Sequence, residues 1–192
     1  MDFLQHIKQP NQDPAIGKLL IAEPFMNDQN FMRKVVLLCD MNTEGTVGFI
    51  LNDLTNYHLG DVLPALDTEG WGLHNGGPVQ MDCLHMLHRL PQLLGGHEIM
   101  PGIYWGGSFD ILQEMAASQN PHIADVKLFL GYAGWSSGQL EKEMQEGSWL
   151  VSDGSTGLLF DTDTADIWER AIRGLGKDFA YLANMPLNPL LN

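Results

Sequence analysis

The most informative part of the chain reads Leu130-Gly131-Tyr132-Ala133-Gly134-Trp135-Ser136-Ser137-Gly138-Gln139-Leu140-Glu141-Lys142-Glu143. Its centre fits the Gly-x-Ser-x-Gly pattern of α/β-hydrolases, in which a tight turn from strand to helix exposes a nucleophilic serine. The neighbouring sequence agrees, because residues 126–133 are predicted as a buried strand and residues 139–145 as a helix. Ser136 and Gln139 also have the spacing of a capping box. Local context alone therefore allows a serine hydrolase.

The positions of the histidines argue against that architecture. A serine hydroxyl needs a base to become a nucleophile, and in α/β-hydrolases the histidine follows the serine along the chain. All seven histidines precede Ser136: His6, His58, His74, His85, His88, His97 and His122. The simpler interpretation is that Gly134 and Gly138 permit a tight entry to the helix, while Ser136 accepts hydrogen bonds from its first N–H groups. We predict no catalytic serine.

The same run resembles the signature of the YqgE/AlgH family of bacterial proteins, Gly-Tyr-Ala-x-Trp-x-x-Gly-Gln-Leu-Glu-x-Glu. Other segments extend the resemblance from about residue 17 to residue 185. They are Gly17–Pro24, Phe31–Val36, Cys39–Asn42, Gly48–Asn52, Gly76-Gly77-Pro78-Val79, His88, Trp149, Leu159-Phe160, Trp168–Ala171 and Leu175-Gly176. Taken together these motifs are specific, although each alone is weak.

The resemblance implies one α+β domain with a mixed, bifurcated, partly barrel-like β-sheet surrounded by helices. It implies no established reaction, and the family label of transcriptional regulator describes a genetic effect without a chemistry. The family usually has a histidine after Cys-Glu, where this chain has Met41 after Asp40. An activity that depends on that histidine is in doubt for this chain.

Length and composition independently indicate one domain. The chain has 192 residues, of which 44% are hydrophobic, enough for one sizeable core and short for two. The polar, proline-marked residues 1–15 are expected to form an extended lead, and residues 16–192 the domain. Neither a secretory signal nor an apolar run long enough for a membrane span is recognised. With two distant cysteines that are expected to stay reduced, the protein is expected in the cytoplasm.

The net charge of −14 bears on possible partners. Duplex binding depends on lysine and arginine side chains that neutralise phosphates. The chain has only ten such residues, and they are spread along it, with Arg33-Lys34 and Arg170/Arg173 as the only close pairs. Direct nucleic-acid binding is therefore not expected. A regulatory effect would pass through a protein or a small molecule.

Hydrophobic patterns and turn residues predict interspersed helices and strands without a βαβ repeat, which favours a mixed α+β domain. The predicted strands are 17–23, 34–40, 46–52, 82–88, 98–105, 126–133 and 148–152, with a hairpin turn at 42–45. The predicted helices are 59–66, 108–118, 139–145, 164–174 and 178–185.

Metal and phosphate sites find little support in the sequence. Cys83 and His85 would leave one face of a strand and His88 the other, so these three zinc-type ligands would not converge. The acidic run 161–166 lacks the glycine and the closing glutamate of a calcium loop, and Asp163 or Thr164 is predicted to cap a helix instead. The Gly-Gly pairs at 76, 95 and 106 lack a nucleotide-binding motif. Turns are their simpler explanation, with a small anion at Gly106-Gly107-Ser108 or at Asn75–Pro78 as the lesser alternative. No metal and no cofactor is predicted.

The remaining candidates form a binding surface. Gln139 and Glu143 lie four residues apart on a predicted helix with Trp135 at its start, and aromatic side chains beside polar groups suit recognition of a partner or a ligand. The alternative is that Tyr132 and Trp135 are core. Cys39, next to Asp40, is interpreted as an inert packed thiol. The candidate ligand-binding or partner-binding residues are Cys39, Asn52, Gly76, Gly77, Pro78, Tyr132, Trp135, Gln139 and Glu143.

The sequence therefore predicts a non-catalytic binding or regulatory protein that acts through an unidentified protein or small-molecule partner. The alternative is a metal-independent enzyme with a pocket near the Gly76-Gly77-Pro78 loop and the Trp135 turn. A deep pocket with a perturbed acid or base beside these residues would favour the enzyme. A flat apolar patch would favour the binding protein.

Overall fold

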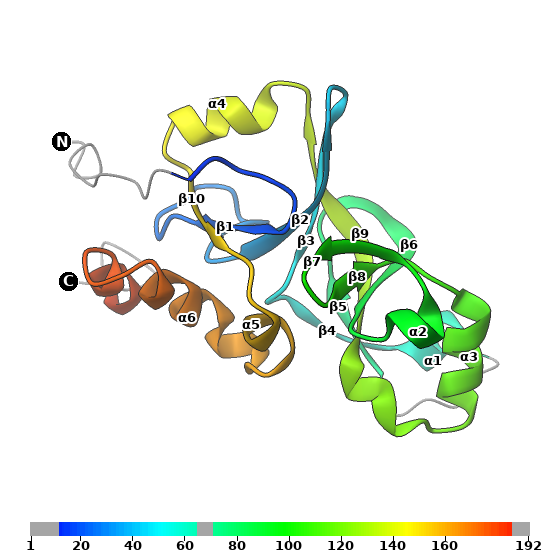
Figure 1. Ribbon diagram of the computed structural model, residues 1–192. Helices are drawn as coiled ribbons and strands as arrows, with labels where there is room; N and C mark the ends of the chain where they lie inside the picture. Colours follow the sequence, from blue (N-terminus) through cyan, green and yellow to red (C-terminus); the bar gives the residue numbers. More distant parts are fainter. Residues whose placement is uncertain (1–11, 65–70, 186–192) are drawn as a thin grey trace.

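The computed structural model describes residues 12–64 and 71–185, and most of the predicted lead 1–15 lies outside these ranges. The described residues form one mixed α+β domain around a curled sheet (Figure 1). Its strands are β1 (Lys18–Ala22), β2 (Val35–Asn42), β3 (Gly45–Ile50), β4 (Leu54–His58), β5 (Gly72–Asn75), β6 (Val79–His88), β7 (His97–Met100), β8 (Ile103–Trp105), β9 (Val126–Ser136) and β10 (Trp149–Asp153). The predicted fold class is confirmed.

Six α-helices and three 3₁₀ helices accompany the strands in the described ranges. They are α1 (Leu59–Val62), α2 (Pro91–Leu94), α3 (Phe109–Ala117), α4 (Gln139–Gln145), α5 (Thr156–Phe160), α6 (Ile167–Gly174), η2 (Pro121–Asp125), η3 (Thr164–Asp166) and η4 (Ala180–Asn184). No helix among the described residues is long and apolar enough to cross a membrane.

Strand β9 is the branch point of the sheet. The main path runs β10-β1-β2-β3-β9-β6-β8-β7, and β4 and β5 form a side branch. One edge of β9 is shared, because residues 133–136 pair with β3 and residues 128–130 pair in parallel with β5. Between the two pairings lies Gly131, whose positive φ of 65° is accessible to glycine at little cost. A Cβ on Gly131 would lie 2.7 Å from two backbone oxygens, so only glycine fits this crossing.

The branched sheet separates three cores, and each has its own helical cover. Trp135 and Trp149 pack with Leu140 of α4 on one face of the β1-β2-β3 part. On the opposite face Leu19 and Phe49 pack with residues of α5, α6 and η4. Figure 1 shows α4 and α6 on opposite sides of these strands. The third core lies beneath α2 and α3 and contains Met86, Leu112 and Leu128.

Several predicted elements are confirmed. Asn42 and Gly45 close the β2–β3 hairpin, with Asn42 Oδ1 accepting from the N–H groups of Glu44 and Gly45. Helix 108–118 is present as α3, capped by Ser108. Asp163 caps η3 through a 3.1 Å bond from the Ala165 N–H, as expected for a cap in place of a calcium loop.

Other predictions were wrong. The predicted strand 98–105 is two strands, because a turn containing Gly102 at φ 79° separates β7 from β8. Strands β4 and β5 and helices α2 and α5 were not predicted. Within the described residues the predicted helix 59–66 is only the four-residue α1, and the predicted helix 178–185 is the short 3₁₀ helix η4.

The predicted capping box was also wrong in part. Gly134, Trp135 and Ser136 continue β9 and do not form a turn, and the residue that caps α4 is Gly138, at φ 76°. Ser136 donates instead of accepting, because its N–H and Oγ both bond Gln139 Oε1, at 3.1 and 3.2 Å.

Candidate functional site

Three of the predicted residues meet at the carboxylate of Glu143. Glu143 Oε2 accepts one bond from Trp135 Nε1 and another from Trp149 Nε1, each 2.8 Å long. Glu143 Oε1 accepts from Gln139 Nε2 at 3.0 Å, because the two residues lie one turn apart on α4. The carboxylate thus accepts three hydrogen bonds, all from uncharged donors.

The two indoles belong to the core. Trp135 is 4% exposed and Trp149 is 1% exposed. Phe31 stacks on Trp135 with ring centroids 6.0 Å apart and meets Trp149 edge-on at 5.5 Å. The alternative that Trp135 is a core residue is therefore correct, and its polar atom is aimed at Glu143. The aromatic cluster of Phe31, Trp135 and Trp149 fixes the position of that carboxylate.

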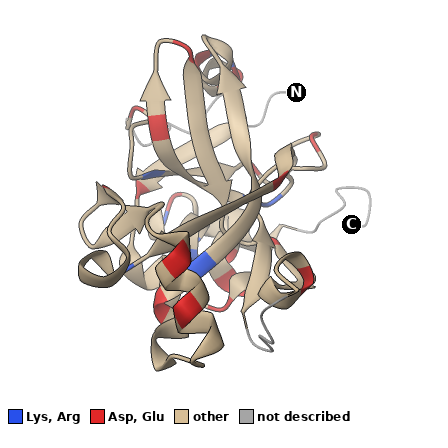
Figure 2. Cartoon of the chain, turned by 90° about the vertical axis from the view of Figure 1, so that its right-hand side faces the viewer, with Lys and Arg blue, Asp and Glu red and all other residues tan. Residues whose placement is uncertain are grey.

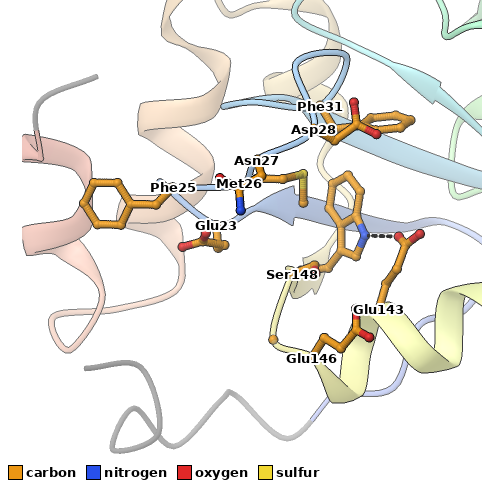
Figure 3. Close-up of a pocket in the computed structure, with 11 residues that line it drawn as sticks. Glu23, Phe25, Met26, Asn27, Asp28, Phe31, Glu143, Glu146 and Ser148 are labelled. Carbon is orange, nitrogen blue, oxygen red and sulfur yellow. Dashed lines mark hydrogen bonds between the residues drawn. The ribbon is translucent and has the colours of Figure 1, made fainter. Parts of the chain in front are cut away.

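Glu143 also lines a cavity of about 420 Å³ (Figure 3), which we call the acidic cavity. Four of its lining residues are carboxylates: Glu23, Asp28, Glu143 and Glu146. Its apolar lining comes from Phe25, Met26, Phe31 and Trp149. No lysine or arginine lines it among residues 12–64 and 71–185. The cavity therefore combines aromatic contact with negative charge.

The carboxylates of this cavity are poorly compensated. Lys142 lies 3.7 Å from Glu146. Glu23, Asp28 and Glu143 have no cationic side chain within 4.0 Å in the part of the chain that is described. Burial raises the pKa of Glu23, although a hydrogen bond from the Phe25 backbone opposes the shift. Its Oε2 is buried without a hydrogen-bond partner among those residues. A positively charged group would relieve both conditions.

Asn52 has a structural role. Its Oδ1 accepts from the Val35 N–H at 2.9 Å and its Nδ2 donates to the Arg33 carbonyl at 2.8 Å. The carboxylate of the next residue, Asp53, accepts hydrogen bonds from Lys34 Nζ at 2.7 Å and from Asn75 Nδ2 at 2.8 Å. Asn52 therefore fastens the start of β2 to the end of β3 and lies outside the acidic cavity.

The Gly76-Gly77-Pro78 loop also serves the fold. A Cβ on Gly76 would lie 2.2 Å from the Gly131 carbonyl oxygen, and one on Gly77 would lie 2.2 Å from the Tyr132 carbonyl carbon. The Gly76 N–H donates to the Leu130 carbonyl and the Gly77 N–H donates to Asn75 Oδ1. The N–H groups that an anion would require are thus already bonded. The glycines allow the loop to lie directly against β9.

Cys39 is buried in the core beneath α6. Burial raises the pKa of its thiol, and Asp40 raises it further. A thiol held in its neutral form is a weak nucleophile. The structure thus separates Cys39 from the acidic cavity and agrees with a packed, inert residue.

Tyr132 lies on the face of β9 opposite Trp135, since the residues are an odd number of positions apart. It packs against the core beneath α6 and lines a shallow hollow of about 410 Å³ with Val79, Gly134 and Trp135. No cysteine or histidine lines this hollow among the described residues. Tyr132 and Trp135 therefore pack in different cores, although both side chains line this hollow.

The histidines near β6 do not converge with Cys83. His85 packs against Phe49 and Tyr132. His88 Nε2 bonds the Gly106 carbonyl at 2.9 Å, and its Nδ1 accepts from the Leu90 N–H at 3.1 Å. In the described ranges no group of three or more His, Cys, Asp or Glu side chains is arranged to hold a metal ion.

Sequence reasoning missed Glu23, Asp28, Phe31 and Trp149 as parts of one site. Phe31 and Trp149 lie within motifs of the family resemblance, but nothing in their spacing connects them. They meet because β1 pairs with both β2 and β10, which brings the 23–31 segment beside the α4–β10 connection.

A model of the family described as AlgH-like matches residues 19–180. The chain belongs to the AlgH-like family. The UPF0301 protein CT0663 of Chlorobaculum tepidum is 40% identical over 177 residues, which cover 92% of this chain and 95% of that protein. A UPF0301 protein of Cytophaga hutchinsonii is 36% identical over 178 residues, which cover 92% and 98%.

Solved structures agree with this AlgH-like assignment. The solution structure of AlgH from Pseudomonas aeruginosa has a TM-score of 0.71 at 29% identity, covering 91% of this chain and 97% of that chain. The crystal structure of DIP2367 from Corynebacterium diphtheriae has a TM-score of 0.74 and covers 91% and 94%. At 21% identity, the latter likeness concerns the fold alone. The names of these AlgH-like proteins identify a family and no reaction, so the function has to be argued from the site.

Proposed function

We propose that this AlgH-like protein is a non-catalytic binding protein, and that its acidic cavity receives a basic side chain of a protein partner. The observation that carries the proposal is the Glu143 carboxylate, which is fixed by two buried indoles at the wall of a cavity that no lysine or arginine lines in the described residues. A regulatory effect of the protein would then be exerted through that partner.

The chemistry of the cavity supports an arginine or lysine side chain. Both carry a cation on an apolar stem, and the stem can pack on aromatic rings while the cation meets carboxylates. Phe31 and Trp149 supply aromatic contact, and Glu23 and Glu143 supply negative charge. The scattered lysines and arginines in Figure 2 likewise support a protein partner over a nucleic acid.

No observation on the described residues specifically favours the metal-independent enzyme. A hollow does lie beside the Trp135 turn, where this alternative expects a pocket, but it is shallow and no cysteine or histidine lines it among the described residues. The Cys39 thiol is buried elsewhere. Two free cysteines support the expected cytoplasmic location, because disulfides are rare in reducing compartments.

The proposal is tested by titrating the protein with a library of short peptides that each contain one arginine, and with the same peptides containing citrulline, which has the same shape without the charge. Tryptophan fluorescence reports binding, since Trp149 lines the cavity. We expect saturable binding of some arginine peptides, at least about tenfold weaker binding of their citrulline forms, and a similar loss in Glu23→Gln.

Glu114→Gln is the matched control, because Glu114 is an exposed carboxylate on α3, away from the cavity. It removes the same charge and should leave binding unchanged. Equal binding of arginine and citrulline peptides, equal losses in the two variants, or no saturable binding at all would contradict the proposal.

A further inference from the structure

A second cavity lies between the β1–β10 strand pair and the C-terminal helices. Its volume is about 590 Å³, within the range of small-molecule sites. It lies near Leu19 and Ser152, whereas the acidic cavity lies near Trp149, at the other end of the same strand pair. Figure 1 shows α5 and α6 running below β10 and β1 at this place. We call it the helix–strand cavity.

One part of the lining of the helix–strand cavity is apolar. Leu19 of β1 and Ala171 of α6 are buried in the same core, and Leu158 and Leu175 are half-buried against that core. Gly157 and Gly174 also line the cavity and leave space that side chains would otherwise fill. Such a surface suits a hydrocarbon group.

Among the described residues, the polar lining has one charged side chain without an oppositely charged partner. Asp153 pairs with Lys18, and Asp161 lies 3.3 Å from Arg89. The Arg170 guanidinium has no carboxylate within 4.0 Å among the described residues, and even Asp166, four residues earlier on the chain, is farther away. The hydroxyl groups of Ser152, Ser155 and Thr162 complete the polar lining.

Arg173, on the same helix, differs from Arg170 because its guanidinium has side-chain partners. Arg173, almost one helical turn further along, bonds Glu169 at 2.8 Å and the side chain of Asn184 at 3.1 Å. Arg170 is exposed, and it is the one cationic side chain that lines the helix–strand cavity among the described residues. An anion that binds there would gain a charge-assisted hydrogen bond.

We propose that the helix–strand cavity binds an amphipathic monocarboxylate of the fatty-acid class. Its carboxylate meets Arg170 and the neighbouring hydroxyls, and its hydrocarbon chain lies over Leu19, Leu158 and Leu175. This site is separate from the acidic cavity, and it takes a ligand of opposite charge.

The test is isothermal titration calorimetry of the full chain with decanoate, below its critical micelle concentration. Decanamide, with the same chain and no charge, is the comparison ligand. We expect saturable binding of one decanoate and at least about tenfold weaker binding of decanamide. Arg170→Gln should weaken decanoate binding about tenfold or more, whereas Arg173→Gln, with the same change in net charge, should bind as the parent does.

Gly174→Leu tests the apolar part. An added Cβ at Gly174 meets nothing within 4 Å and its φ is not positive, so this helical substitution fills the mouth of the cavity without strain. It should abolish decanoate binding while the urea midpoint stays the same or rises. Failure of decanoate to saturate, equal affinity for decanamide, or equal binding by the Arg170 and Arg173 variants would overturn the assignment. Arginine-peptide binding, measured on the same variants, reports on the acidic cavity separately.

Discussion

At the scale of single residues, Glu143 connects stability with the proposed site. A carboxylate beside two buried indoles satisfies donors that would otherwise lack partners. An unpaired buried donor costs about 1–3 kcal/mol. The same arrangement keeps the carboxylate in one orientation at the cavity wall, so it is prepared for a cation without a further loss of side-chain freedom.

We expect Glu143→Leu to lower the free energy of unfolding by about 2–4 kcal/mol, because both indole N–H groups lose their acceptor. Glu143→Gln, which keeps one acceptor oxygen, should lose less. Urea titration followed by tryptophan fluorescence measures both. Glu141→Leu is the control, since Glu141 is exposed on the same helix. A Glu143→Leu variant as stable as this control would show that the indole bonds contribute nothing.

The predictability of the site also differs from residue to residue. Trp135, Gln139 and Glu143 could be placed together because helical spacing is local information. Trp149 joins them through the next strand, and Glu23 reaches the cavity from a segment 120 positions earlier in the numbering. Such a contact depends on which strands pair, and a single sequence does not contain that information in its local pattern.

At the scale of elements, local sequence information predicts the β2–β3 hairpin but not the side branch of the sheet formed by β4 and β5. The β2–β3 hairpin was predictable because Asn42 and Gly45 carry its turn chemistry. Strands β4 and β5 were not, because they are short and four of the five β4 residues are exposed. Their hydrogen bonds come from each other and from β9. Tertiary pairing here overrides weak local preference.

Gly131 at the branch of β9 gives a test of this element. We expect Gly131→Ala to destabilise the protein by about 3–4 kcal/mol, from the positive φ together with overlap with the carbonyl oxygens of Gly77 and Val79. Gly138→Ala is the matched control, because its φ of 76° is similar and an added Cβ meets nothing within 4 Å. Its cost should be about 1–2 kcal/mol.

Urea unfolding measures the difference between the free-energy losses of the two variants, provided that the slope of the free energy of unfolding against urea concentration is the same in both. Equal losses in the two glycine variants would mean that backbone conformation alone, and not the close approach of the Gly77 loop, makes glycine necessary at the branch.

At the scale of the whole molecule, the acidic composition and the buried histidines make opposite contributions to the response to pH. Lowering the pH toward the isoelectric point of about 4.6 reduces repulsion among the carboxylates. The buried histidines act in the other direction. Burial lowers the pKa values of His74, His85 and His88, so the folded protein resists protonation at positions that the unfolded chain protonates freely.

His74 should dominate the histidine contribution. It is 6% exposed. Burial, followed by the charge of Lys127, lowers its pKa to about 4, against opposing effects of the Leu128 backbone and Asp53. A base whose folded pKa is lowered costs stability once the pH falls below its unfolded value of about 6.5. The loss grows until the folded pKa is reached.

We therefore expect the free energy of unfolding of the parent protein to fall by about 2 kcal/mol more than that of His74→Leu when the pH is lowered from 7 to 5. Both proteins share the contribution of the carboxylates, so this contribution cancels when the change in free energy of unfolding of one protein is subtracted from that of the other. The sign of the difference then reports on His74. Urea titrations at several pH values supply it, and His97→Leu, at an exposed histidine, should run parallel to the parent. Parallel curves for the parent and His74→Leu would mean that His74 is protonated as readily in the folded protein as in the unfolded chain, and that its burial has no cost.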